Sequence, residues 1–148
     1  MSDVTPPIPT AGLLRLGYNA LSARLFATIA ASGFEDLRAA HGNVMEQLSF
    51  EDGLRLTDLA ARAGMTAQSM GELVDDLVEL CYVERRPDPA DRRAKRIHLT
   101  ARGAKNVRAG FRAVADQERE LAELLGETAH RRLRGTLEKL LAEYREPT

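Results

Sequence analysis

The chain has 148 residues and is poor in several residue types on which other protein classes depend. A single cysteine, Cys81, excludes an internal disulfide and a cysteine-rich zinc site, so we expect a reducing, cytoplasmic setting. Tryptophan is absent and aromatic residues make up 5%, which argues against carbohydrate platforms and base-stacking sheets. No apolar run approaches the roughly 18–20 residues that span a bilayer, and residues 1–10 lack the basic residues of a secretory signal, so no membrane partner is expected.

Charge is unevenly distributed along the chain. In total 21 basic and 22 acidic residues leave a net charge of −1, and 44% of the residues are hydrophobic, a balance typical of one globular domain. Residues 1–80 hold 5 basic and 11 acidic side chains (net −6), residues 81–112 hold 10 and 3 (+7), and residues 113–148 hold 6 and 8 (−2). A dense positive segment on an acidic chain indicates a phosphate-binding surface, with a solvated helix face as the alternative.

The N-terminal third is predicted to be helical after a loose start. Three prolines within residues 1–10 predict a flexible arm. Apolar residues recur at helical spacing over residues 12–31, and Ser32-Gly33 ends that helix. A second helix is predicted over residues 34–48, and the polar segment 49–55 connects it to the next helix.

A helix-turn-helix unit is predicted next. Thr57 is a candidate N-cap of a short first helix that stops at Gly64, and Thr66 is the candidate N-cap of a second helix over residues 67–80. The second helix carries an apolar stripe made of Met70, Leu73, Val74, Leu77 and Leu80. Two short helices joined by a tight turn with glycine are typical of this DNA-binding unit.

A β-hairpin and two long helices complete the prediction. Strands over residues 81–86 and 95–99 are expected to pair, with residues 87–94 as an irregular tip. Thr100 is positioned to cap a long helix, which Gly126 interrupts before a last helix over residues 128–144. The terminal helices have more apolar residues in their stripes than a small core needs, which favours a dimer. The alternative is that these helices pack on the central helix-turn-helix and hairpin.

The segment Leu56–Gly103 combines the helix-turn-helix with a specific hairpin motif. An acid, a basic residue, an aliphatic residue and a Leu-Thr pair stand at fixed offsets: Asp91, Arg93, Ile97, Leu99 and Thr100. With this motif the chain resembles the multiple-antibiotic-resistance regulator (MarR) family of winged helix-turn-helix transcription factors. The resemblance implies a mainly α (α+β) fold with about six helices, dimerisation helices at both ends and one β-hairpin, the wing.

The same resemblance implies a division of the chain. It places the flexible arm at residues 1–10, an N-terminal dimerisation helix at 11–33, the winged helix-turn-helix DNA-binding region at 34–99, and C-terminal dimerisation helices at 100–146. We expect these parts to form a single compact domain overall.

The function expected from the resemblance is that of a regulator of transcription, weighed against one alternative. A sequence-specific repressor would bind a pseudo-palindromic operator in double-stranded DNA as a homodimer and be released by a small-molecule effector. The alternative is a helical dimeric protein-interaction module with a vestigial DNA-binding unit. No enzyme, cofactor or metal site is expected, because the three histidines are far apart and no nucleophile or phosphate-loop pattern occurs.

Four residues at the start of the second helix of the helix-turn-helix unit are expected to read bases in the major groove: Thr66, Ala67, Gln68 and Ser69. For Thr66, capping alone is the competing interpretation. In the wing, Arg93 resembles the residue that enters the minor groove, and Asp91 resembles the partner that shapes the wing tip. A plain surface ion pair is the alternative for these two. Contacts to the DNA backbone are expected from four further residues: Arg86, Arg92, Lys95 and Arg96.

The chain departs from the family pattern at three positions. Glu72 and Asp76 are acidic where the family often has a basic residue, which lowers the charge that this helix brings to DNA. Cys81 stands where glycine is usual. Because Cys81 follows the negative end of a helix dipole, we expect a small packing residue between helix and wing rather than an oxidant sensor.

The resemblance also implies a site for a small anionic or phenolic ligand where the dimer helices meet the DNA-binding lobe. Arg15, Tyr18 and His41 are the polar residues that could line it. The alternative for His41 is that it is a core residue whose ring nitrogens have hydrogen-bond partners within the chain, as is usual for a histidine on an apolar stripe.

Overall fold

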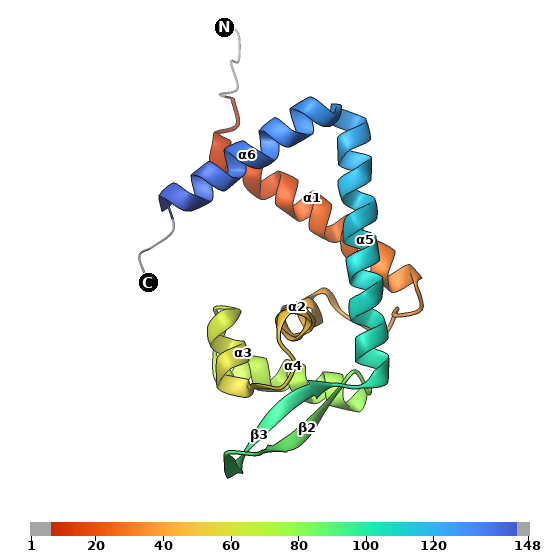
Figure 1. Cartoon of the computed structure of the whole chain (residues 1–148), viewed down its shortest axis with the longest axis vertical. Coiled ribbons are helices and arrows are strands. Elements are labelled where there is room, and N and C mark those ends of the chain that lie inside the picture. The colour runs from red at the N-terminus through yellow and green to blue at the C-terminus, as the bar shows by residue number, and fades with distance from the viewer. Residues whose placement is uncertain (1–6, 145–148) are drawn as a thin grey trace, which may run out of the picture. The chain divides into compact units, whose positions relative to one another are not determined.

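Residues 7–144 are described by a computed structural model, and in this range the chain is mainly helical with one small sheet (Figure 1). This confirms the predicted fold class. The elements in chain order are α1 (Thr10–Ala31), the 3-10 helix η1 (Ala39–His41), α2 (Gly42–Phe50), β1 (Leu54–Arg55), α3 (Leu56–Arg62), α4 (Ala67–Glu79), β2 (Val83–Asp88), β3 (Asp91–Leu99), α5 (Ala101–Leu125) and α6 (Glu127–Tyr144).

The chain divides into two compact units, Met1–Gly110 and Phe111–Thr148. The boundary between the two units lies inside α5. The reason is that the first turns of α5 pack into the first unit, where Asn106 and Ala109 are buried. In the second unit, the carboxylate of Glu118 on α5 forms an ion pair with Arg134 of α6 at 2.7 Å and lies 3.4 Å from Nε2 of His130.

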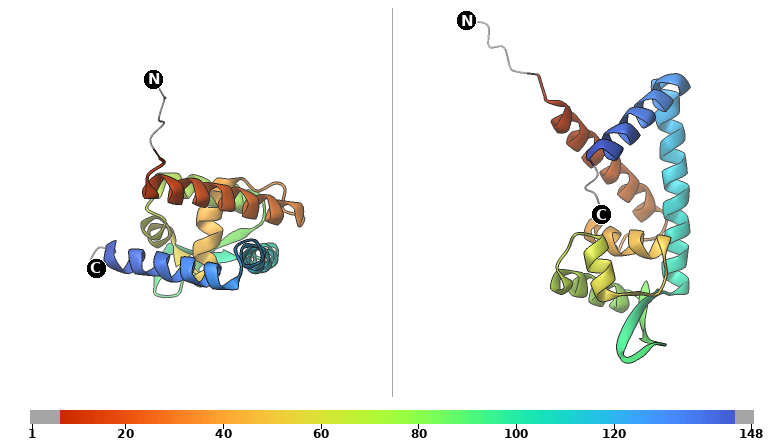
Figure 2. Two further views of the ribbon diagram at one scale, coloured as in Figure 1. Left: turned by 90° about the horizontal axis from the view of Figure 1, so that it is seen from above. Right: turned by 60° about the vertical axis from the view of Figure 1, so that its left-hand side comes forward.

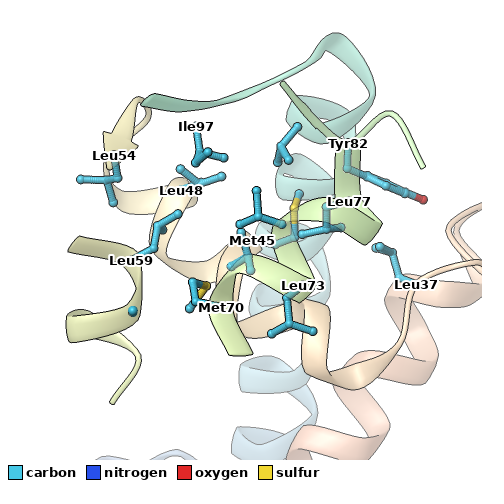
Figure 3. Close-up of a cluster of buried hydrophobic side chains, with 14 of the residues drawn as sticks. Leu37, Met45, Leu48, Leu54, Leu59, Met70, Leu73, Leu77, Tyr82 and Ile97 are labelled. Atoms are coloured by element: carbon cyan, nitrogen blue, oxygen red, sulfur yellow. The ribbon is translucent and has the colours of Figure 1, made fainter. Parts of the chain in front are cut away.

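The core of the first unit lies between α2, α3, α4 and the sheet (Figure 3). The buried face of α4 consists of Met70, Leu73, Val74 and Leu77, as the apolar stripe predicted, and Leu80 is partly buried. They meet Leu48 of α2, Leu59 of α3 and Ile97 of β3. Each fully buried aliphatic side chain contributes about 1.5–3 kcal/mol to stability by leaving water. This cluster therefore fixes the position of α4 relative to α2, α3 and the sheet.

Of the two N-caps predicted for the helix-turn-helix unit, the one at the start of α4 is confirmed and the one at the start of α3 is wrong. Gly64 adopts φ 63°, and the Thr66 hydroxyl accepts the N–H of Ser69 at 3.1 Å, which confirms Thr66 as N-cap. The Thr57 prediction is wrong, because α3 starts at Leu56 directly after Arg55. Arg55 belongs to β1 and is held extended by pairing with β3, so the strand sets the start of the helix.

The sheet has three antiparallel strands in the order β1-β3-β2 and not only the predicted hairpin. The two residues of β1 pair with Ile97 and Arg96, too short a strand for a periodic signal. The hairpin strands also reach further than predicted, to Asp88 and from Asp91, despite Pro87. Since β2 is an edge strand, the N–H that proline lacks is not needed there. The hairpin projects beyond α2, α3 and α4 (Figure 2).

The predicted helix over residues 34–48 is replaced by a loop, η1 and α2. The loop after Gly33 (φ 99°) buries Phe34 and Leu37 in the core, which a continuous helix would not do. Tertiary packing thus overrides helical periodicity in this segment.

Cys81 has a role other than the expected packing between helix and wing. Its side chain is exposed and its φ is +62°, a left-handed conformation. The N–H of Cys81 bonds the carbonyl of Val78 at 3.0 Å, and the N–H of Tyr82 bonds that of Leu77 at 2.8 Å. This pair of bonds closes the end of α4 in a Schellman motif, whose left-handed position favours glycine. The geometry explains why glycine is usual there.

Candidate nucleic-acid interface

The start of α4 is open to solvent. Thr66, Ala67, Gln68 and Ser69 are all exposed, as the sequence predicted for base-reading residues. Besides capping α4, the Thr66 hydroxyl donates to the Ser69 hydroxyl at 3.0 Å. Gln68 lies on the face of α4 opposite the buried stripe, so its amide is available to a partner outside the chain.

The tip of the wing carries exposed cations that have no acid partner in the described part of the chain. The Asp91 carboxylate accepts the backbone N–H of Arg93 at 3.0 Å, a local side-chain-to-backbone hydrogen bond at the tip. Arg92, Arg93 and Lys95 are exposed, and none of the ion pairs formed within residues 7–144 involves them. Three positive charges at the end of a projecting hairpin form a surface for polyanions.

The root of the wing is organised by a buried acid that sequence analysis missed. Asp88 is fully buried; its Oδ2 lies 2.7 Å from Nε of Arg55 and 3.1 Å from Nε of Arg96, and its Oδ1 accepts the N–H of Ala90 at 2.9 Å. The hydrogen bond from Ala90, with the two guanidinium groups, lowers the pKa of Asp88 to about 2. The carboxylate thereby ties the end of β2 to β1 and β3.

Arg96, expected as a contact to the DNA backbone, is engaged at this root. Its guanidinium faces Asp88 and also donates to the carbonyl of Gly53 at 3.1 Å. Gly53 itself needs its glycine, because its φ is 79° and a Cβ would lie 2.6 Å from the ring of His98. Arg86 is exposed but forms an ion pair with Glu84 at 2.5 Å, so it is less available than the cations at the tip.

His41 is buried with both ring nitrogens near partners. Its Nδ1 accepts the backbone N–H of Arg38 at 3.0 Å, and its Nε2 lies 3.4 Å from the carboxylate of Asp76. Arg38 forms an ion pair with the same carboxylate. Asp76, one of the departures from the family pattern, is therefore committed to a contact between η1 and α4.

The three candidate ligand residues do not meet around a common cavity in the described part of the chain. Arg15 and Tyr18 lie on α1 and are exposed, Tyr18 by 71%, whereas His41 is buried. A hollow of about 350 Å³ lies elsewhere, at the corner between α5 and α6 around Gly126, lined by Leu125 and Arg132 among others.

A second polar cluster missed by sequence analysis fixes the end of α4 to the start of α5. The Tyr82 hydroxyl donates to Asp36 at 2.7 Å, and Arg102 pairs with Asp36 at 2.9 Å and donates to the carbonyl of Leu80 at 2.6 Å. Burial and then the Asp36 carboxylate raise the pKa of Tyr82, and the Tyr82 hydrogen bond lowers that of Asp36. Gly103 completes the contact, since a Cβ there would lie 2.1 Å from the Tyr82 carbonyl.

Comparison with known proteins decides the family. A MarR-family profile matches residues 35–94. The HTH-type transcriptional regulator PetP of Rhodobacter capsulatus is 30% identical over 112 residues, which cover 66% of this chain and 68% of that protein. The chain belongs to the MarR family. It is a MarR-family transcriptional regulator, and neither the family nor its structural neighbours are enzymes.

Solved MarR-family structures share the fold. The reduced form of MarR from Escherichia coli superimposes with a TM-score of 0.81 at 23% identity, covering 93% of this chain and 99% of that one. MepR from Staphylococcus aureus gives a TM-score of 0.74 at 22% identity with the same coverage. These results confirm the winged helix-turn-helix predicted from Leu56–Gly103. Within residues 7–144, no helix is long and apolar enough to cross a membrane.

Proposed function

We propose that this MarR-family regulator represses transcription by binding a pseudo-palindromic operator as a homodimer, and that a small anionic or phenolic effector releases it. The observation that carries the proposal is the set of free cations at the wing tip. Among residues 7–144, Arg92, Arg93 and Lys95 have no ion pair that must break before they bind a phosphate. A related S. aureus protein, a MepR mutant, has been crystallised bound to an oligodeoxyribonucleotide, which supports the same use of the fold.

The proposed contacts divide into those that read sequence and those that supply affinity. Thr66, Ala67, Gln68 and Ser69 at the start of α4 face the major groove, where glutamine recognises adenine through paired hydrogen bonds. Arg93 enters the minor groove, where narrow A·T-rich segments concentrate negative potential. Asp91 holds the backbone of Arg93 in place for this contact.

The remaining cations of the wing contribute unequally. Arg92 and Lys95 contact phosphates directly, which adds affinity without sequence preference. Arg86 contributes to the affinity for DNA only after its ion pair with Glu84 is replaced by a contact to a phosphate. Arg96 positions the wing through its contact with Asp88, and we no longer count it among the residues that contact phosphates.

A homodimer accounts for apolar surface that the single chain exposes. No residue of α1 is buried, and the exposed apolar residues of this helix include Leu13, Leu14, Leu16, Tyr18 and Leu21. In the second unit the exposed apolar residues include Phe111, Val114, Leu124, Leu133, Leu141 and Tyr144. Large apolar patches mark interaction sites. In the dimer, Arg15 and Tyr18 belong to the helices that would flank the effector.

Binding to DNA at several salt concentrations tests the proposal. Labelled fragments from the source genome are titrated with the protein and followed by fluorescence anisotropy, and the mass is measured by sedimentation. We expect a dimer, a selected fragment with an inverted repeat, and affinity that falls steeply with salt because several cations displace counterions. A protein that binds no duplex at any salt would refute the proposal, and if that protein is also a dimer, the result favours the protein-interaction module.

A further inference from the structure

The outer face of α4 carries acids where a DNA-reading helix usually carries cations. The residues opposite the buried stripe are Gln68, Glu72, Asp75 and Glu79, with Asp76 at the edge. Carboxylates near phosphates weaken binding to any duplex, so each acid on this face has to be explained.

Two of these acids are neutralised within the chain. Asp75 pairs with Arg85 of β2 at 2.5 Å, and Asp76 pairs with Arg38 and lies 3.4 Å from His41. Glu72 and Glu79 are exposed, and no hydrogen bond or ion pair of the described residues involves either side chain. The chain therefore compensates the acids beside Glu72 and leaves Glu72 free.

Glu72 lies closer to the DNA-reading end of the helix than Glu79 does. It is four residues after Gln68 and so lies one turn away on the same face. Helical side chains lean toward the N-terminus, which brings the Glu72 carboxylate over the turn that carries Gln68. Glu79 is seven residues further on, about 10 Å along the axis, at the last residue of α4.

A free carboxylate in the major groove selects among bases because it only accepts hydrogen bonds. Guanine presents two acceptors there, and thymine presents an acceptor and a methyl group, so both are unfavourable. Adenine presents a donor beside the N7 acceptor, which repels a carboxylate. Cytosine presents its N4 amino donor, and it is the base that a lone glutamate favours.

From this geometry we infer that Glu72 is a specificity-determining residue, which accepts a hydrogen bond from the N4 amino group of one cytosine in each half-site. The inference rests on the proposed binding of an operator by α4. Glu72 also penalises every site that lacks this cytosine, because its charge is then left unpaired near phosphates.

Selection of binding sites from a random duplex library tests the inference. The full-length protein, Glu72→Gln, Glu72→Ala and the matched control Glu79→Gln are each taken through selection, after thermal unfolding has shown that all are folded. Glu79→Gln removes the same charge from the same face of the helix. For the wild type and the control we expect one column per half-site to be cytosine, preferred by about tenfold over other bases.

The variants should change that column alone. Glu72→Ala should lose the preference there and bind random duplex several-fold more tightly, and Glu72→Gln should shift the column toward adenine. If both variants keep the cytosine column, or if Glu72→Gln and Glu79→Gln merely raise affinity for all duplexes alike, the inference is overturned. A wild type that selects no sequence would instead overturn the proposed function itself.

Discussion

The tip and the root of the wing both contain arginines, but those at the tip are free and those at the root are bound to an acid. At the tip, Arg92 and Arg93 are exposed and have no ion pair within the described chain. At the root, Arg55 and Arg96 surround the buried carboxylate of Asp88. Both pairs of arginines belong to the same small sheet and its hairpin, yet only one pair is available to another molecule.

The difference teaches that counting basic residues overstates the charge offered to DNA. The +7 of residues 81–112 includes Arg85, Arg86, Arg96 and Arg102, which are bound to acids of this chain. The free cations are those available to phosphates, whereas Arg96 is bound to Asp88 and ties the two strands of the hairpin together. A rigid support is what a binding group needs to act in a fixed geometry.

The largest effect is expected from breaking the root. Asp88→Asn leaves Arg55 and Arg96 without their shared negative charge, and a buried pair that loses one partner is strongly destabilised. Both the unfolding temperature and the affinity for the operator should fall, measured by circular dichroism and anisotropy. Asp91→Asn, at the exposed tip, is the control and should unfold like the wild type. An unchanged unfolding temperature for Asp88→Asn would show that the root does not organise the wing.

Acid should release the same contact. The pKa of Asp88 is lowered from 3.8 to about 2, so the group binds a proton less readily in the folded chain than in the unfolded one. Its contribution to stability is therefore complete above about pH 4 and is lost as the pH falls toward 2. Urea unfolding between pH 5 and pH 2 should show a shallower decline for Asp88→Asn than for the wild type. Parallel profiles would assign the acid sensitivity to other groups.

Removing Arg93, the tip cation proposed to enter the minor groove, should affect binding and leave stability unchanged. Arg93→Ala is expected to weaken operator binding by about 1–3 kcal/mol, more at A·T-rich flanks, with an unchanged unfolding temperature because the side chain is exposed. Arg86→Ala is the matched comparison, and its loss should be smaller because Glu84 already neutralises Arg86. Equal losses for the two variants would contradict the distinction between free and paired arginines.

A smaller effect is expected from Lys95, the tip cation proposed to contact only phosphate. Lys95→Ala should weaken operator and random duplex alike and reduce the slope of log affinity against log salt by about one unit. Titrations at four salt concentrations measure both quantities. A loss confined to the operator would mean that Lys95 reads sequence.

The sequence predicted those parts of the fold that have a local signal. The buried stripe of α4 and the Thr66 cap follow from spacing within a few residues. The roles of Asp91 and Arg93 at the wing tip are implied by the resemblance to the MarR family and stay predictions. Segment 34–38 was mispredicted because its course is set by packing of Phe34 and Leu37 and not by local preference. A strand of two residues, β1, has no period to detect.

The root of the wing was missed for a different reason. Asp88 and Arg55 are 33 residues apart in the sequence, so nothing local connects them. Asp88 lies between two prolines, in a segment interpreted as an irregular tip. The likeness to other MarR proteins at 22–23% identity supports the fold but assigns no partner to either residue. The pairing becomes visible only when β1 and β2 both flank β3.

The smallest effect is expected from Cys81→Gly, which should change the stability of the fold without changing its binding to DNA. This variant therefore tests whether the losses expected at the root come from stability or from binding. Cys81 adopts φ +62° at the end of α4, where a side chain costs about 1–2 kcal/mol relative to glycine. Cys81→Gly relieves this strain, and the greater freedom of glycine in the unfolded chain offsets part of the gain, so we expect about 0.5–1 kcal/mol of added stability. Cys81→Ala keeps a Cβ and should give no such gain. Operator affinity should be unchanged in both variants, because the mutation leaves the free cations of the tip and the buried carboxylate of the root as they are. If affinity instead rises with stability, the loss of operator affinity in Asp88→Asn would have to be attributed to unfolding rather than to a change in the position of the wing.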